Sequence, residues 1–313
     1  MCGRGSQALV LKNKNLSFDR NVQCNGTGYT LAALVSIFYG IPQLPLKSVH
    51  FANEKNKRIY KINSIFDYFF QAGYNCTFMQ GGHMEFAGKK HLFSNRPHIK
   101  IISFKELSKD KKYLTNPRPF IWGVDDSVLL NNLKTECLLQ CKTGKPFFIA
   151  ALTVNTHFPN GYLPPGANAK KEYSYPEVVK YTDRQLSNFV KWVKEQSFAN
   201  DTTLIIVGDH LSMPTSLTPG LEKYGKSTYP SKRKTYNCFI NSVPIPEKRS
   251  GRFFSTFDLM PTILHAAGAE WGSDRLHLGV SLFGKTPTLL EKYGIKQYET
   301  ESLKFSKKYL QLF

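Results

Sequence analysis

Apolar positions along the chain follow two spacings, and each spacing predicts a different kind of element. Short continuous apolar runs predict strands over residues 74–80, 146–154 and 202–207, the last two of them buried. Apolar residues at helical spacing predict helices over residues 28–40, 62–73, 126–141, 176–196 and 256–268. Because strands and helices alternate, we expect an α/β protein with a mainly parallel sheet covered by helices on both faces.

Several residues mark where these elements begin and end. Gly40, Gly73 and Gly268 follow the last turns of three predicted helices, and Asp126 is placed to cap the helix over 126–141. Segments 160–175 and 213–235 are rich in Pro, Gly, Ser and Lys. We therefore expect them to be surface loops near a functional site.

Length and charge limit the class of protein and of partner. The chain has 313 residues and 41% hydrophobic content, enough to bury the core of one large α/β domain or two smaller ones, and this excludes a disordered protein. Its 42 Lys and Arg against 23 Asp and Glu give a formal charge of +19, which favours phosphate-bearing substrates, anionic lipid headgroups or nucleic acid. Nothing resembles a nucleic-acid-binding signature, so we expect no nucleic-acid partner.

The cysteines and the apolar runs exclude two further readings. The six cysteines form no paired CxxC spacing, so neither a zinc site nor a disulfide framework is expected, and most should be buried as small apolar side chains. The sequence has no apolar run of about 18 residues and no signal-peptide core at its start.

Polar residues follow the predicted strands where ligands gather in such sheets. Asp209 and His210 directly follow the strand over 202–207, and His157 follows the strand over 146–154. A carboxylate beside an imidazole suits a divalent cation, although for this pair alone an Asp turn cap with a surface His is the more common explanation. Thr30 follows the glycine-rich stretch "NGTG" at a predicted helix start, where it is either a plain cap or a nucleophile activated by a metal.

Six segments in fixed order resemble the catalytic domain of phosphoglycerol transferases, the group that includes phosphoglycerol transferase I and lipoteichoic acid synthase. They are "GTGYTLAALVSIFYGIPQLPL", "FMQGGHMEFAGKK", "WGVDDSVL", "LTVNTHFPNGY", "TTLIIVGDHLSM" and "FFSTFDLMPTILHAAG". This group belongs to the alkaline phosphatase and sulfatase superfamily. The resemblance implies an alkaline-phosphatase-like three-layer α/β/α sandwich, with a catalytic domain over residues 1–285 and a C-terminal tail or helix over 286–313.

The resemblance also implies roles for individual residues. Thr30 matches the nucleophile that takes phosphoglycerol from phosphatidylglycerol and passes it to a glycan or polyglycerolphosphate acceptor. Asp209 and His210 match ligands of one divalent ion, manganese or else magnesium or zinc, which also contacts Thr30. The substrate-binding positions are matched by His157, His83, Glu85 and Lys89. Full-length members act at the outer face of the cell membrane, so an anionic bilayer is the expected partner.

One part of the family pattern has no match here. Members begin the catalytic domain with a buried strand that ends in a glutamate metal ligand, and we find no equivalent, so we expect a truncated domain with a weaker cation site and exposed sheet edges. Two alternatives therefore stay open. One is a non-catalytic remnant; the other is a related phosphoethanolamine transferase, phosphodiesterase or sulfatase-like hydrolase, although Cys24 does not open a sulfatase C-x-P-x-R motif.

Overall fold

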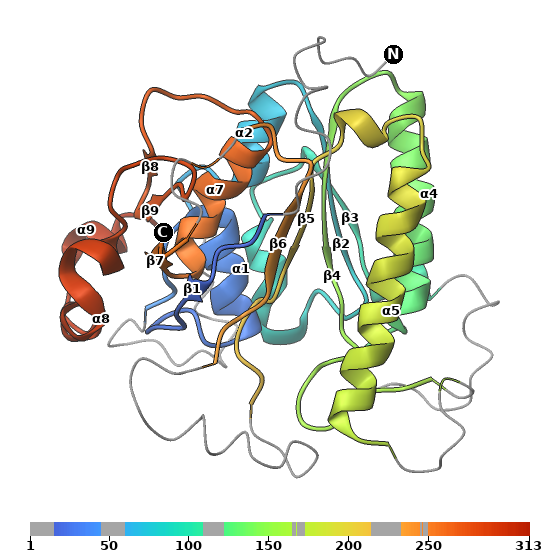
Figure 1. The fold of residues 1–313 in the computed structure, drawn as a ribbon, viewed down its shortest axis with the longest axis horizontal. Coiled ribbons are helices and arrows are strands. Elements are labelled where there is room, and N and C mark those ends of the chain that lie inside the picture. Colours follow the sequence, from blue (N-terminus) through green and yellow to red (C-terminus); the bar gives the residue numbers. More distant parts are fainter. Residues whose placement is uncertain are drawn as a thin grey trace. The chain divides into compact units, whose positions relative to one another are not determined.

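A computed structural model describes residues 16–44, 60–108, 122–164, 167, 173–213, 233–244, 246 and 250–313 (Figure 1). Contacts divide the chain into two compact units. Unit 1 is built mainly from Phe69–Ala199, and unit 2 from Gly3–Tyr68, Asn200–Leu211 and Tyr224–Phe313. Each unit is described separately below.

Unit 1 contains a parallel sheet of three strands in the order β3-β2-β4. Its strands are β2 (Asn75–Gln80), β3 (Ile99–Ile102) and β4 (Phe147–Leu152). Its helices are η2 (Phe86–Leu92), α3 (Phe104–Leu107), α4 (Asp126–Lys142) and α5 (Tyr175–Lys194). Helix α4 contacts both β2 and β4, and α5 packs on α4, so these two helices cover the sheet (Figure 1).

Unit 2 places helix α1 (Thr30–Tyr39) against η4 (Thr256–Asp258) and α7 (Leu259–Ala266). Its paired strands are β1 (Arg20–Asn21) with β7 (Phe253–Phe254), β5 (Leu204–Val207) with β6 (Asn237–Ile240), and β8 (Arg275–Leu276) with β9 (Gly279–Val280). Its C-terminal helices are α8 (Leu289–Ser302) and α9 (Lys307–Leu310). The pairing of β1 with β7 is parallel and the other two are antiparallel. Two short elements, α2 (Ile65–Gln71) and η3 (Ala199–Asp201), span the positions where the chain passes between the units.

Most of the predicted helices and strands are present, with ends shifted by a few residues. Gly40, Gly73 and Gly268 lie after α1, α2 and α7 with φ of 60°, 85° and 85°. Because this left-handed conformation is strained for residues with a Cβ, glycine ends these helices as predicted.

The predicted cap of α4 is wrong by one residue. Asp125 is the cap, and its side chain accepts a hydrogen bond from the Ser127 N–H. Asp126 is the first residue of the helix, fully buried, and its carboxylate accepts hydrogen bonds from the backbone of Val154 and Asn155 instead. Tertiary contacts after β4 thus decide between two adjacent aspartates that look alike in the sequence.

The predicted burial of two strands is also wrong. Five of the six residues of β4 are half-buried and Ala151 is exposed, while all four residues of β5 are half-buried. Within the described residues, β4 pairs only with β2, and β5 only with β6. Each strand therefore has one edge without a paired strand among the described residues, and the absence of the family's first strand stays a prediction.

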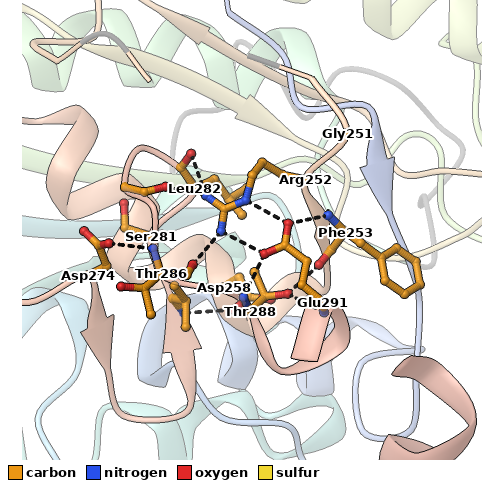
Figure 2. Close-up of polar contacts among 12 residues, drawn as sticks. Gly251, Arg252, Phe253, Asp258, Asp274, Ser281, Leu282, Thr286, Thr288 and Glu291 are labelled. Carbon is orange, nitrogen blue, oxygen red and sulfur yellow. Dashed lines mark hydrogen bonds and ion pairs between the residues drawn. The ribbon is translucent and has the colours of Figure 1, made fainter. Parts of the chain in front are cut away.

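A buried ion pair holds the C-terminal part of unit 2 together (Figure 2). The Arg252 side chain is 3% exposed, and its guanidinium pairs with Glu291 at 2.9 Å between Nε and Oε1. The same guanidinium donates to the carbonyl oxygens of Leu282, Gly284 and Thr286. Since the three carbonyls lie on the chain that links β9 to α8 and Glu291 lies in the first turn of α8, Arg252 fixes that connection against β7.

The described cysteines are free thiols, and the two predicted loops are only partly described. All five cysteines in the described ranges are free, and Cys24, Cys76 and Cys137 are buried; Cys2 lies outside these ranges. Most of predicted loops 160–175 and 213–235 also lies outside them, and the domain division at residue 285 stays a prediction. Across the described residues, no helix is both long and apolar enough to cross a membrane.

Candidate functional site

Unit 2 brings Thr30, Asp209 and His210 together, although 180 residues separate the first from the last. The Thr30 Oγ1 lies 3.4 Å from the His210 Nε2, which lies 3.5 Å from the Asp209 Oδ2. Asp209 and His210 follow the end of β5, and Thr30 opens α1. The side chains of His210 and Asp209 are 17% and 30% exposed, so the group is accessible to a ligand.

The partners of the two ring nitrogens of His210 determine its tautomer, and so whether the nitrogen that faces Thr30 carries a proton or a lone pair. The Nδ1 lies 2.9 Å from the carbonyl oxygen of Leu211, and a carbonyl only accepts, so Nδ1 carries the proton. In the neutral ring Nε2 is therefore unprotonated and faces Thr30 and Asp209. This is the tautomer that a metal-binding histidine needs, with its second nitrogen fixed by a backbone acceptor.

These three side chains fit a divalent cation by distance and by donor type. Two ligands that share one cation at about 2.0–2.2 Å lie about 3–3.6 Å apart. The 3.4 and 3.5 Å separations about His210 Nε2 fall in this range. Among the described residues, no three or more His, Cys, Asp or Glu side chains form a metal-binding cluster; the third polar side chain in this group is the hydroxyl of Thr30.

Glycines and one glutamine hold the loop before α1 in place. The Gln23 Oε1 accepts a hydrogen bond from the Leu211 N–H at 2.8 Å and so joins this loop to the one that carries Asp209 and His210. A Cβ at Gly28 would lie 3.1 Å from the Gln23 side chain. Gly26 has a φ of +82°, and a Cβ there would lie 2.8 Å from Pro42. The glycines therefore allow the loop before α1 to pack closely on Pro42 and on the Gln23 side chain that bonds to Leu211.

Unit 1 holds the other predicted residues, at the carboxyl ends of its strands. His157 follows β4, and its ring packs on the indole of Trp122 with centroids 4.1 Å apart. Trp122 also contacts Phe86, edge to face at 5.3 Å, and the Lys89 Nζ lies 5.0 Å from the centre of the Phe86 ring. One continuous series of contacts thus joins two predicted substrate-binding residues, His157 and Lys89, through two aromatic residues.

Lys89 is a buried cation. Lys89 is only 7% exposed. Burial lowers the pKa of its ammonium to about 8, and the nearby Glu85 carboxylate opposes this shift. A lysine with little water around it gains more from a phosphate oxygen than an exposed one does. Glu85 itself is exposed and precedes η2.

His83 lies apart from this series of contacts. Its exposed ring packs on Phe104, with centroids 4.2 Å apart. His157 is oriented by its own backbone, because its Nδ1 lies 2.6 Å from the carbonyl oxygen of Phe158 and must donate to it. The Nε2 of His157 can therefore donate to a phosphate only when the ring is protonated.

Two aspartates at the start of α4 fix the loop that carries His157. The Asn155 side chain accepts from the Asp126 N–H at 2.9 Å and donates to the Asp125 carboxylate at 2.7 Å. The Asp126 carboxylate accepts from the Val154 N–H at 2.7 Å, and burial raises the pKa of this carboxyl to about 7. Trp122 lies three residues before Asp125, so the same bonds hold the tryptophan and histidine segments next to each other.

Sequence reasoning missed Gln23, Phe86, Trp122 and Asn155 as contributors to these sites. Trp122 and Asn155 lie inside the quoted segments "WGVDDSVL" and "LTVNTHFPNGY", four residues before Asp126 and two residues before His157 respectively. A search for aromatic and amide side chains next to each candidate would have found them. Gln23 carried no such signal, since its partner Leu211 is remote in sequence.

Comparison with known proteins identifies the family. The family model described as Sulfatase matches residues 7–269. Phosphoglycerol transferase I of Xanthomonas axonopodis pv. citri is 26% identical over 248 residues, which is 76% of this chain but 34% of that protein. The chain therefore spans about a third of the length of this curated relative.

Two solved structures share the fold. The lipoteichoic acid synthase LtaP of Listeria monocytogenes aligns with a TM-score of 0.63 at 18% identity, covering 89% of this chain and 68% of that one. The Streptococcus pyogenes phosphoglycerol transferase GacH, in complex with sn-glycerol-1-phosphate, aligns with a TM-score of 0.54 at 16% identity, covering 83% and 66%. These likenesses confirm the predicted α/β fold of the alkaline phosphatase type. Because the Sulfatase family model matches most of the chain, the chain belongs to the sulfatase family.

Proposed function

We propose that this chain is the catalytic part of a phosphoglycerol transferase. The donor is phosphatidylglycerol in an anionic bilayer, at the outer face of the cell membrane, and the acceptor is a hydroxyl of a glycan or of polyglycerolphosphate. The observation that carries the proposal is the meeting of Thr30, Asp209 and His210, at 3.4 and 3.5 Å, from two distant segments of the chain. The similarity to phosphoglycerol transferase I over 76% of this chain supports the substrate.

Thr30 is the proposed nucleophile. Its Oγ1 attacks the phosphorus of the donor, the bond from phosphorus to the diacylglycerol oxygen breaks, and that oxygen leaves with the threonine proton as diacylglycerol. This first half-reaction leaves phosphoglycerol esterified to Thr30. In the second half-reaction, the acceptor hydroxyl attacks the same phosphorus, the bond to Thr30 breaks, and the acceptor proton returns to Oγ1.

Asp209, His210 and Thr30 are the proposed holders of one divalent cation, manganese before magnesium or zinc. When bound, such an ion lowers the pKa of the threonine hydroxyl and offsets phosphate charge. The described residues supply three donors, and an oxygen-rich set of this kind with one imidazole accepts all three metals to differing degrees. His210 holds its Nε2 toward the site through the bond from Nδ1 to Leu211.

The proposed role of the unit 1 residues is to bind the glycerol phosphate. Lys89 and protonated His157 each offer a positive charge or a donor to phosphate oxygens. His83 and Glu85 are proposed contacts for glycerol hydroxyls; both are exposed and neither belongs to the Trp122 contact series. The complex of GacH with sn-glycerol-1-phosphate supports a site for this group in a protein of the same fold.

Covalent capture tests the proposal directly. The full chain is incubated with phosphatidylglycerol and manganese, without acceptor, and intact mass and peptide mapping then locate any phosphoglycerol ester. We expect the ester on Thr30 and none on Thr30→Ala. The substitution should leave the fold intact, because Tyr29 is the cap of α1 and makes no side-chain capping bond, so the cost stays below about 1 kcal/mol.

Two controls separate the chemistry from the fold. Thr30→Ser keeps a hydroxyl and should keep part of the labelling, while Thr27→Ala removes a nearby threonine whose hydroxyl is bonded to the Cys24 carbonyl and should keep all of it if the loop stays folded. An ester that forms equally on the Thr30→Ala variant would disprove the nucleophile. Release of glycerol phosphate without an ester would favour a hydrolase, and no reaction by a folded chain would favour a non-catalytic remnant.

A further inference from the structure

Residues 303–310 lie at the C-terminal end of unit 2 and include helix α9 (Figure 1). They combine exposed apolar side chains with lysines. Leu303 and Phe305 are 64% and 61% exposed, and Leu310 is 36% exposed. Lys304, Lys307 and Lys308 alternate with them and are also exposed. The Lys304 Nζ pairs with the exposed Glu301 carboxylate at 2.6 Å, and residues 302–313 contain no Asp or Glu. We call residues 303–310 the basic apolar segment.

The segment is exposed although its far side is firmly attached. The Tyr309 hydroxyl donates to the Pro42 carbonyl oxygen at 2.7 Å and accepts from the Leu44 N–H at 2.9 Å. The Leu312 carbonyl accepts from the Lys61 N–H at 2.9 Å, and the Phe313 ring packs on Tyr60. These contacts all lie within unit 2, so Leu303 and Phe305 are held outward rather than left loose by fraying.

We propose that the basic apolar segment docks on an anionic lipid bilayer. Leucine and phenylalanine enter the boundary between headgroups and acyl chains, while lysines keep their charge at the headgroups. An apolar protein partner would not require three exposed lysines, and a soluble polyanion would not require Leu303 and Phe305. The absence of acidic residues over 302–313 makes the charge complementary to anionic headgroups.

Docking on a bilayer rests on the proposed function, in which the donor is a membrane lipid. The new element is the part of the chain, residues 303–310, that contacts the bilayer. Docking through Leu303 and Phe305 does not require recognition of one headgroup. Binding should therefore be similar on vesicles that contain phosphatidylglycerol and on vesicles that contain phosphatidylserine, and weak on phosphatidylcholine alone.

Vesicle co-sedimentation of the full chain tests the docking surface. We expect Leu303→Ser with Phe305→Ser to weaken partitioning onto anionic vesicles about tenfold or more. The matched control is Leu138→Ser with Leu139→Ser, two leucines of α4 that are 43% and 50% exposed, and it should bind like the unaltered chain. Circular dichroism of each variant verifies that it is folded.

A second pair of variants separates local charge from the total charge of +19. Lys304→Gln, Lys307→Gln and Lys308→Gln together should weaken binding several-fold, whereas Lys142→Gln, Lys145→Gln and Lys194→Gln, which remove the same charge from unit 1, should change it little. Equal losses in the two triple variants, or unchanged binding by the Leu303 and Phe305 variant, would overturn the inference. A change from oligomer to monomer in that variant, without loss of vesicle binding, would assign the segment to a protein interface instead.

The vesicle measurement needs no turnover. Thr30→Ala should bind vesicles as the unaltered chain does, whether or not Thr30 is the nucleophile. A failure of the transferase proposal and a failure of the docking proposal therefore give different results.

Discussion

Lys89 is a buried lysine with a lowered pKa, so we expect KM for the donor to depend on pH. Its pKa is lowered to about 8 by burial, so the ammonium is charged below that pH and neutral above it. We expect KM for the donor to rise as pH increases from 7 to 9, by up to about tenfold, because about a tenth of the lysine stays charged one unit above its pKa.

Lys89→Arg tests this dependence, because arginine stays charged throughout that range. The alkaline rise in KM should disappear in this variant, while Lys90→Arg, at the exposed neighbouring position, should keep it. A variant whose KM still rises in parallel with that of the unaltered chain would remove Lys89 from the substrate site.

At the residue scale, the closeness of Thr30 to Asp209 and His210 was predicted from the family resemblance and not from local sequence patterns. The strand ending at Val207 and the helix starting at Thr30 could be predicted from apolar spacing, but not their closeness, since that depends on contacts between residues far apart in the chain. The prediction of Asp126 as the cap failed for the same reason. Both aspartates are good caps, and the contacts of Val154 and Asn155 with Asp126 distinguish them.

At the scale of elements, the loop after β4 depends on one buried amide. Asn155 is fully buried, and its replacement by alanine would leave the Asp126 N–H and one oxygen of Asp125 without their partner. We expect Asn155→Ala to lower the free energy of unfolding by about 2–3 kcal/mol, since each unsatisfied buried polar group costs about 1–3 kcal/mol. Hydrogen exchange over residues 153–162 should become faster as well.

Asn132→Ala is the matched control for that loss. Asn132 lies on α4, half-buried, and its side chain bonds only to the Val128 carbonyl among the interactions in the described part of the chain. Asn132→Ala should therefore lower the free energy of unfolding much less than Asn155→Ala and leave hydrogen exchange after β4 unchanged. Equal destabilisation by both substitutions, with no faster exchange at 153–162, would show that the loop does not depend on Asn155.

Element existence was easier to predict than element burial. The apolar runs of β4 and β5 correctly predicted strands, but their composition suggested full burial, which a sheet provides only to a strand with neighbours on both sides. Short strands such as β3 and β6, with four residues each, gave too few positions for a period to be recognised. The glycine stops were predictable because the left-handed backbone after a helix is a local property.

At the scale of the whole molecule, the half-buried apolar strands should influence association. Ala151 is exposed on β4, an edge strand among the described residues, and charges on such edges oppose intermolecular pairing. We expect Ala151→Lys to reduce concentration-dependent light scattering without lowering the midpoint of unfolding. Ser197→Lys adds the same charge at an exposed position outside any strand and should have a smaller effect. Identical scattering in both variants would mean that net charge, and not this edge, controls association.

The sequence allowed either one large domain or two smaller ones, and the structure divides into two compact units. This division could not be derived from composition, because unit 2 is assembled from three separate stretches of chain that pair through β1 with β7 and β5 with β6. The predicted substrate residues and the predicted cation ligands fall in different units, unit 1 and unit 2 respectively.

The most direct test of the central claim is a calorimetric titration of manganese into the full chain, with Asp209→Ala as the control. We expect saturable binding by the unaltered chain and its loss in the variant. Manganese should also stabilise only the unaltered chain, by about 2.7 kcal/mol at a hundredfold excess over Kd. A folded chain that binds no manganese, or a variant that binds it equally well, would contradict the assignment of Thr30, Asp209 and His210 as one cation site.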